Sequence, residues 1–277
     1  MNKKYEILEN RSMDLADGEK CCRIRALRDF GDVKAGDIGG FIQKEENLSH
    51  DGTCWLYDNA VAIEDAKVSM DAKLKDSAIA KGSASVFGKA VIEECGIADG
   101  NTRVMHNAKI TGEAQATDSS VVTGNVVLQD RFMIKGNGFV SGSFNGKGRA
   151  VITDYGMGIE NSVLGYDAVI KDRGMISGNA EAGGKAVIEM NGIVTEQAKI
   201  TGEALVTDCA KVEGNAKISD RAFVKDFAQV GGATYLMDRV VVAGHVTLDG
   251  TDTYTGEEII SDQNAEVAQD NALFQEL

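Results

Sequence analysis

Apolar residues recur at every sixth position over most of this chain. The series begins at Ala62, Val68 and Leu74 and runs without insertion or deletion to Val242 and Leu248. A fixed period held over this length indicates a repeat architecture, in which each unit packs mainly against its neighbours. We therefore expect one elongated repeat body flanked by caps, rather than several compact domains.

Each six-residue unit is predicted to be a short strand followed by a corner. In the unit at residues 215–220, Ala216 and Ile218 alternate with Lys217 and Ser219, which places the apolar pair on one side of a strand. Glycine or aspartate dominates two positions after the aliphatic residue, as at Gly82, Gly88, Gly112, Asp118, Gly124, Asp130, Gly136 and Asp220. Both residue types tolerate a positive φ or close a turn. Three units therefore make a triangular coil of about 18 residues.

Small residues mark the inside of the predicted corners. The alanine column comprises Ala60, Ala66, Ala72, Ala78, Ala84 and Ala90, and later Ala198, Ala204, Ala210, Ala216, Ala222 and Ala228. Only a small side chain fits inside a tight corner of a packed core. Where Phe144 interrupts the column, Gly146 occupies the next aliphatic position, which indicates compensation of volume in the core.

The repeated order of an aliphatic residue, Gly or Asp, and Ala resembles that of the hexapeptide-repeat superfamily. This resemblance covers residues 60–250 and implies an all-β, left-handed parallel β-helix of about ten triangular coils. Residues 29–41 and 47–60 are similar to the N-terminus of YdcK-like proteins and their bacterial and phage relatives. Some of those relatives are labelled acetyltransferases. A right-handed helix of the bactofilin type is the structural alternative.

The ends of a stacked β-helix expose unpaired strand edges, so we expect a cap at each end. Residues 5–8 and 22–27 alternate like two strands, and Trp55 is expected to close the first coil. At the other end, Ser261 is a candidate N-cap of a helix directed toward Phe274. The predicted division is a β cap over 1–59, the β-helix over 60–250 and an acidic cap or tail over 251–277.

Outward-pointing strand residues fall into three columns, because every third unit returns to the same face. The second column, which includes Lys67 and Gln229, is apolar only in its middle, and the third, with Lys73, Lys109 and Lys199, is largely polar. The first column is polar only at Gln115, and its other members are Val61, Ile79, Ile97, Met133, Val151, Val169, Val187, Leu205, Phe223 and Val241.

An apolar strip of this length exceeds what soluble monomers normally expose, so we expect it to be an oligomer interface. Relatives of this fold usually form parallel trimers, and the resemblance therefore implies a homotrimer, with a dimer as the other possibility. The alternative is that β-branched residues occupy the column for strand propensity alone.

Histidine is the residue that would carry catalysis in this superfamily, whose acyltransferases use it as a base and bind the acyl donor between subunits. His50 falls in the cap, His106 at a corner facing away from the first column, and His245 at a corner beside that column, above Phe227. His245 and His106 are thus the candidate catalytic residues of the alternative function. The unbroken register leaves no room for the loop that usually builds the acceptor pocket, so no catalytic residue is expected in the favoured function.

Metal and cofactor sites are not predicted. The three histidines are too dispersed along the repeat to converge on zinc. Aspartates recur at one corner, at Asp118, Asp154, Asp172, Asp208 and Asp226, where calcium between coils is the less favoured alternative to a role as turn residues. The five cysteines lack CxxC spacing and form an odd set, which favours reduced thiols.

The charge of the chain restricts its partners. A formal net charge of −14 argues against nucleic acid, which is bound by clustered Lys and Arg. After Arg239 the sequence contains no further basic residue, so a basic protein could be attracted to that end. The chain shows no secretion signal and no stretch long and apolar enough for a bilayer, which predicts a cytoplasmic protein.

Two functions follow from these observations. The favoured one is a non-catalytic, trimeric β-helix that binds or presents a partner. Its phage-related resemblance predicts sequestration of a small ligand or blocking of a host protein. The alternative is an acyltransferase of the hexapeptide-repeat type that uses acyl-CoA.

Overall fold

The computed structural model describes residues 3–15 and 18–262. It divides into two compact units, residues 1–146 and 147–277, which we describe one at a time. Each unit is built from two-residue strands separated by turns, and the first unit also contains the cap. The chain folds as a left-handed parallel β-helix with about 12 turns of about 18 residues, against the ten expected.

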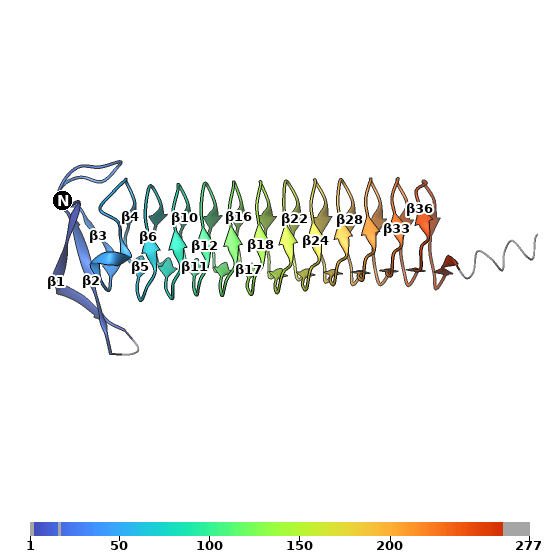
Figure 1. The fold of residues 1–277 in the computed structure, drawn as a ribbon, viewed down its shortest axis with the longest axis horizontal. Helices are drawn as coiled ribbons and strands as arrows, with labels where there is room; N and C mark the ends of the chain where they lie inside the picture. Colours follow the sequence, from blue (N-terminus) through green and yellow to red (C-terminus); the bar gives the residue numbers. More distant parts are fainter. Residues whose placement is uncertain (1–2, 16–17, 263–277) are drawn as a thin grey trace, which may run out of the picture. The chain divides into compact units, whose positions relative to one another are not determined.

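The cap is a three-stranded antiparallel extension of the first β-helix face (Figure 1). β1 (Tyr5–Asp14) pairs with β2 (Lys20–Ala26), and β2 pairs with β3 (Ile38–Ile42). A short 3-10 helix, η1 (Glu45–Asn47), follows β3. β3 then pairs in parallel with the first coil, with Phe41 opposite Val61. The two predicted cap strands are confirmed, and β3 is an additional strand.

The coils of the first unit have three faces, which carry the three columns predicted from the sequence. The first face contains β5 (Val61–Ala62), β8 (Ile79–Ala80), β11 (Ile97–Ala98), β14 (Gln115–Ala116) and β17 (Met133–Ile134). The second contains β6 (Lys67–Val68), β9 (Ser85–Val86), β12 (Arg103–Val104), β15 (Val121–Val122) and β18 (Phe139–Val140). The third contains β4 (Trp55–Leu56), β7 (Lys73–Leu74), β10 (Val91–Ile92), β13 (Lys109–Ile110), β16 (Val127–Leu128) and β19 (Asn145–Gly146).

The second unit repeats the same three faces. The first contains β20 (Val151–Ile152), β23 (Val169–Ile170), β26 (Val187–Ile188), β29 (Leu205–Val206), β32 (Phe223–Val224), β35 (Val241–Val242) and β38 (Ile259–Ile260). The second contains β21 (Met157–Gly158), β24 (Met175–Ile176), β27 (Ile193–Val194), β30 (Lys211–Val212), β33 (Gln229–Val230) and β36 (Thr247–Leu248). The third contains β22 (Val163–Leu164), β25 (Glu181–Ala182), β28 (Lys199–Ile200), β31 (Lys217–Ile218), β34 (Tyr235–Leu236) and β37 (Thr253–Tyr254).

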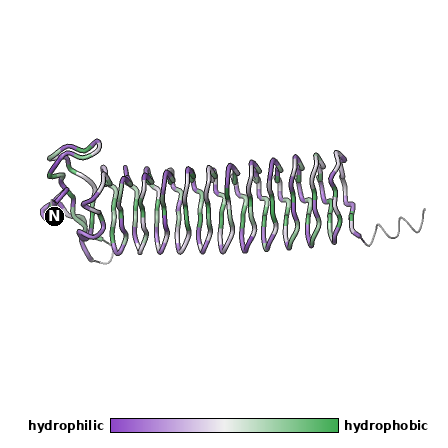
Figure 2. The backbone as a smooth tube through the Cα atoms, turned by 45° about the horizontal axis from the view of Figure 1, so that its top comes forward, coloured by the Kyte–Doolittle hydropathy of each residue, from purple (hydrophilic) through white to green (hydrophobic). Residues whose placement is uncertain are grey.

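Equivalent residues of successive coils lie directly above one another. In the second unit Val169 pairs with Val187 and Ile170 with Ile188, both in parallel. The N–H of Val187 in turn donates to the carbonyl of Ala204 at 2.9 Å. Successive side chains of a strand point to opposite faces, so one residue of each two-residue strand points inward and the other outward. Hydrophobic and hydrophilic positions therefore alternate along each coil (Figure 2).

Corner residues adopt the left-handed backbone conformation, as expected for Gly and Asp. Asp118, Asp130 and Asp220 have φ values of 61°, 60° and 56°. The same conformation is imposed on less tolerant residues, including Tyr166 at 58° and His106 at 62°. Regular stacking of the coils therefore decides the backbone conformation even where the side chain does not favour it.

The core of each coil is filled by the predicted inward residues. Every alanine of the alanine column is fully buried. Phe132 and Phe144 meet edge to face with ring centroids 5.9 Å apart. A Cβ on Gly146 would lie 2.6 Å from the Phe132 ring, so a glycine is required there. Gly146 therefore compensates for a large side chain in the core, and the side chain that it accommodates directly is that of Phe132.

Coils occur on both sides of the predicted β-helix segment. Trp55 is buried in β4, which already belongs to the third face and pairs with β7. Beyond residue 250, β37 and β38 pair with the preceding coil. The helix predicted between Ser261 and Phe274 lies almost wholly outside the described residues. Within the described part of the chain, no helix has the length and apolar character needed to cross a bilayer.

Candidate functional site

The apolar column of the first face is half-exposed in both units. In the first unit Ile79, Ile97 and Met133 are half-exposed, Gln115 interrupts the series, and Val61 is 9% exposed. In the second unit the series is uninterrupted, with members Val151, Val169, Val187, Leu205, Phe223 and Val241. Ile259 extends it by one coil and is 61% exposed. We call the series from Val151 to Ile259 the apolar row.

Charged residues border the apolar row on both flanks. On one flank Lys171 Nζ lies 2.6 Å from Glu189 Oε2. On the other, Glu203 accepts from Lys185 at 3.1 Å and from Arg221 at 3.0 Å. These pairs bridge successive coils. An apolar centre with a polar rim is the arrangement found in protein–protein interfaces.

The third face is less polar than the sequence columns suggested. Lys199 and Lys217 are exposed, as expected, but Val163 and Tyr235 occupy equivalent outward positions. The faces therefore differ in whether their outward apolar residues form an unbroken series. Charged residues interrupt the apolar ones on the third face, whereas the apolar row of the first face is continuous through the second unit.

His245 lies at the corner that joins the first and second faces, between β35 and β36. Its ring stacks on Phe227 with centroids 4.9 Å apart and planes 11° from parallel. Its Nδ1 lies 3.5 Å from Asp262 Oδ2, and its backbone N–H donates to the same oxygen at 3.4 Å. The predicted stacking on Phe227 is confirmed, and Asp262 is an additional partner that the sequence did not indicate.

Gly244 makes room for the carboxylate beside His245. A Cβ at Gly244 would lie 1.9 Å from Asp262 Oδ1, and the residue has a φ of +74°. The N–H of Gly244 is bound by Asp226 Oδ2 at 3.0 Å. Desolvation raises the pKa of Asp262, but hydrogen bonds from the His245 backbone and side chain outweigh it, so the pKa is lowered. Asp262 is thus held as a carboxylate next to the imidazole.

An open groove of about 580 Å³ surrounds this histidine. Phe227 and Lys225 line one part of it, and Val241 and Ile259 of the apolar row line another. The side chains of His245 and Asp262 are 75% and 53% exposed. If Nδ1–H donates to Asp262, Nε2 is free to accept a proton from a bound group, which is the arrangement of a general base. The groove is the candidate site for a small ligand.

His106 is placed differently. It occupies a left-handed corner between the second and third faces of the first unit, and its Nδ1 lies 2.7 Å from Thr123 Oγ1. No carboxylate is paired with it among the described residues. The prediction that it faces away from the first column is confirmed.

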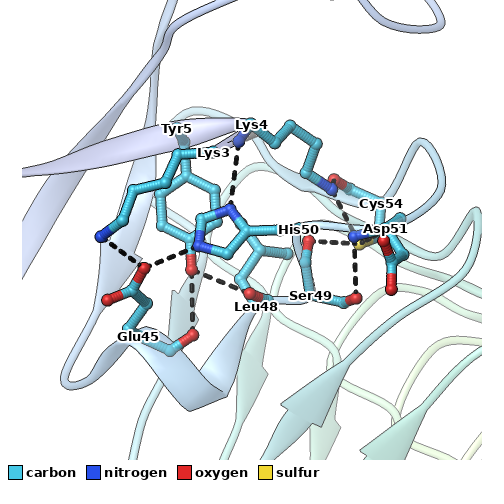
Figure 3. Close-up of polar contacts among 9 residues, drawn as sticks. All are labelled: Lys3, Lys4, Tyr5, Glu45, Leu48, Ser49, His50, Asp51 and Cys54. Carbon is cyan, nitrogen blue, oxygen red and sulfur yellow. Dashed lines mark hydrogen bonds and ion pairs between the residues drawn. The ribbon is translucent and has the colours of Figure 1, made fainter. Parts of the chain in front are cut away.

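His50 belongs to a polar cluster inside the cap (Figure 3). Its Nδ1 accepts from the backbone N–H of Lys4 at 3.2 Å, so Nε2 carries the proton that is donated to Glu45 Oε1 at 2.7 Å. The ring stacks on Tyr5 at 4.3 Å, and the Tyr5 hydroxyl lies 2.8 Å from the Leu48 carbonyl. Both ring nitrogens are therefore used in holding the cap together.

The corner aspartates act on the backbone. Asp118 Oδ2 accepts from the N–H of Gly136 at 2.9 Å, and Asp208 Oδ2 from that of Asp226 at 3.2 Å. Each carboxylate thus binds the corner of the next coil. In the described ranges, no group of three or more His, Cys, Asp or Glu side chains is arranged to hold a metal ion.

Part of the chain is similar to a known protein. No protein-family model matches the chain. A segment of 79 residues is 34% identical to the uncharacterized acetyltransferase YdcK of Escherichia coli strain K12. The match covers 28% of this chain and 24% of that protein, so the chain spans about a quarter of the relative's length. Together with the stacked coils, this similarity fits the hexapeptide-repeat β-helix superfamily.

Proposed function

We propose that this chain is a self-assembling β-helix scaffold whose apolar row is buried between copies, with a homotrimer as the assembly. The observation that carries the proposal is the continuity of the row from Val151 to Ile259, with ion pairs along both flanks. Copies packed around a threefold axis would bury the row and leave the other two faces open to a partner.

The assembly predicts that one aspartate in the row breaks the oligomer. Val169→Asp places a charge in the centre of the contact, where burying an unpaired carboxylate is costly. Val163→Asp is the matched control, because Val163 is also half-exposed and outward-pointing in the second unit but lies on the third face.

Light scattering after size exclusion measures the result. We expect a trimer for wild type and for Val163→Asp, a monomer or weakened trimer for Val169→Asp, and a monomer for Val169→Asp combined with Val187→Asp. A monomeric wild type at micromolar concentration, or equal dissociation of the two single variants, contradicts the proposal.

The partner of the scaffold is proposed to be a basic protein or a small ligand in the groove at His245. The net charge of −14 favours attraction of a basic partner at low ionic strength. The groove favours a ligand with an apolar part for Phe227 and Ile259 and a polar part for His245.

A second candidate function, acyl transfer from acyl-CoA, is favoured by one specific observation. His245 has a carboxylate on its Nδ1 side and lies beside the row that would be shared between subunits. In this function Nε2 of His245 takes the proton of an acceptor hydroxyl or amine as it attacks the thioester. The acetyltransferase label of the partial relative agrees with this reading.

Acetyl-CoA distinguishes the two functions. If acyl transfer occurs, release of free CoA thiol in the presence of amine or hydroxyl acceptors falls on the order of 100-fold in His245→Asn and less in Asp262→Asn. His106→Asn is the control, because asparagine tolerates the left-handed corner of His106. No acetyl-CoA-dependent thermal shift and no thiol release in wild type would leave the scaffold as the function.

A further inference from the structure

A lysine amine and a cysteine sulfur lie in contact inside the cap. Lys4 and Cys54 are both fully buried. Lys4 Nζ lies 2.9 Å from the Cys54 carbonyl oxygen and 3.2 Å from Cys54 Sγ (Figure 3). The two residues precede β1 and β4, so their contact joins the first cap strand to the first coil strand.

No carboxylate forms an ion pair with Lys4 among the residues that the structure describes. Besides Cys54, its Nζ lies 5.0 Å from the centre of the Phe30 ring. The Cys54 thiol lies 3.4 Å from the Ser49 carbonyl, to which it donates. Burial lowers the pKa of Lys4 and raises that of Cys54. The lowered pKa increases the fraction of Lys4 in the neutral form, which is the nucleophilic form of an amine.

The other cysteines have different surroundings. Cys21 is equally buried, but its Sγ is near the Met13 carbonyl at 3.7 Å. Cys22 is half-exposed, and Cys95 and Cys209 are exposed. Within the described residues, Cys54 is the cysteine whose sulfur contacts a lysine amine.

We propose that Lys4 and Cys54 form a reversible sulfur–nitrogen cross-link when the protein meets a peroxide. The Cys54 thiol takes one oxygen atom from the peroxide to become a sulfenic acid, and one water is released. The Lys4 nitrogen then attacks the sulfur, the S–O bond breaks, and hydroxide leaves as water with a proton from the amine. Sulfur is oxidised by two electrons, the peroxide is reduced, and an S–N bond joins the residues.

The cross-link would tie the start of the cap to the β-helix across a long loop. Without the cross-link, β1 is held to this region by hydrogen bonds such as those of Lys4, Tyr5 and His50. A covalent bond would restrict the unfolded chain and slow opening of the cap. Oxidation is therefore expected to raise the thermal midpoint and protect the first strand from proteolysis, and dithiothreitol is expected to reverse both effects.

Intact mass and peptide mapping after limited hydrogen peroxide treatment test the proposal. Wild type is expected to lose two hydrogens and to yield a joined peptide containing Lys4 and Cys54, and dithiothreitol restores the original mass. Lys4→Met keeps the length of the side chain without the amine, so its Cys54 is expected to stop at the sulfenic acid and react with dimedone. Cys21→Ser, the buried-cysteine control, should still cross-link.

Three results overturn the inference. The first is a wild-type Cys54 that reacts with dimedone as fully as that of Lys4→Met. The second is a joined peptide that retains an added oxygen, which rules out the direct S–N bond. The third is a Cys54 that stays reduced when Cys95 is completely oxidised. The wild-type measurements alone decide these last two results, even if Lys4→Met fails to fold.

Discussion

The cap and the coils are stabilised in different ways. In the coils, most backbone hydrogen bonds and most buried corner residues have a counterpart in the next coil. In the cap, polar contacts such as that of Tyr5 with Leu48 occur once and join residues far apart in the chain. Redundant contacts should tolerate substitution better than unique ones, because neighbouring coils share the strain.

The largest loss of stability is expected from a substitution where the cap meets the coils. A Cβ on Gly40 of β3 would lie 2.3 Å from the backbone oxygen of Ala60, an atom that cannot move without shifting the first coil. Gly40→Ala should lower the free energy of unfolding by about 3 kcal/mol. In the coils, a Cβ on Gly183 would meet only the exposed ring of Tyr166, so Gly183→Ala should be nearly neutral. Urea unfolding followed by circular dichroism measures both, and equal losses would refute the comparison.

An intermediate loss of stability is expected when a polar contact is removed from the cap, compared with one in the coils. Asn47 is fully buried and donates from Nδ2 to the carbonyls of Glu64 at 3.0 Å and Ala66 at 2.9 Å. Asn47→Ala leaves both carbonyls without that donor and should cost about 2 kcal/mol. In the coils, Asp118→Asn keeps an oxygen for the Gly136 N–H and should cost less than about 0.5 kcal/mol. Hydrogen exchange should show faster opening of the cap only in Asn47→Ala.

The smallest change in stability is expected from the titration of a cap carboxylate. Hydrogen bonds from Lys73 Nζ at 2.9 Å and the Tyr57 hydroxyl at 2.7 Å pull the pKa of Asp32 down from its ordinary 3.8 to about 2. The folded state therefore binds the proton more weakly than the unfolded state, and Asp32 contributes stability above pH 3.8 that is lost as pH falls through about 2.

Asp32→Asn separates this contribution from general acid unfolding. The carboxylate is 58% exposed, so the loss at pH 7 should be small. The thermal midpoints of wild type and Asp32→Asn should differ slightly at pH 7 and converge near pH 2. A difference that stays constant across this range would mean that packing of residue 32, rather than its charge, stabilises the cap.

The accuracy of the sequence predictions follows the same division between regions. The coils, the corners with positive φ and the outward columns were predicted because each depends on residues at fixed spacing. Ile259 was missed only because the β-helix was ended at residue 250, although the period continues to it from Val241. The Lys4–Cys54 contact and the role of His50 had no periodic signal, because they join residues 46 and 50 positions apart.

The pairing of His245 with Asp262 shows why such a site can be identified only in the tertiary structure. The sequence places His245 at a corner, but its partner is 17 residues away and reaches it only because Gly244 carries no side chain.

By itself, the sequence determined the repeat of strand and corner and the division into inward and outward residues, since both depend on a fixed spacing of six residues. Tertiary structure alone decided which side chains meet in the cap and at the His245 groove. Contacts of that kind depend on the space left between coils and on burial, and neither quantity can be derived from the spacing of residues along the chain.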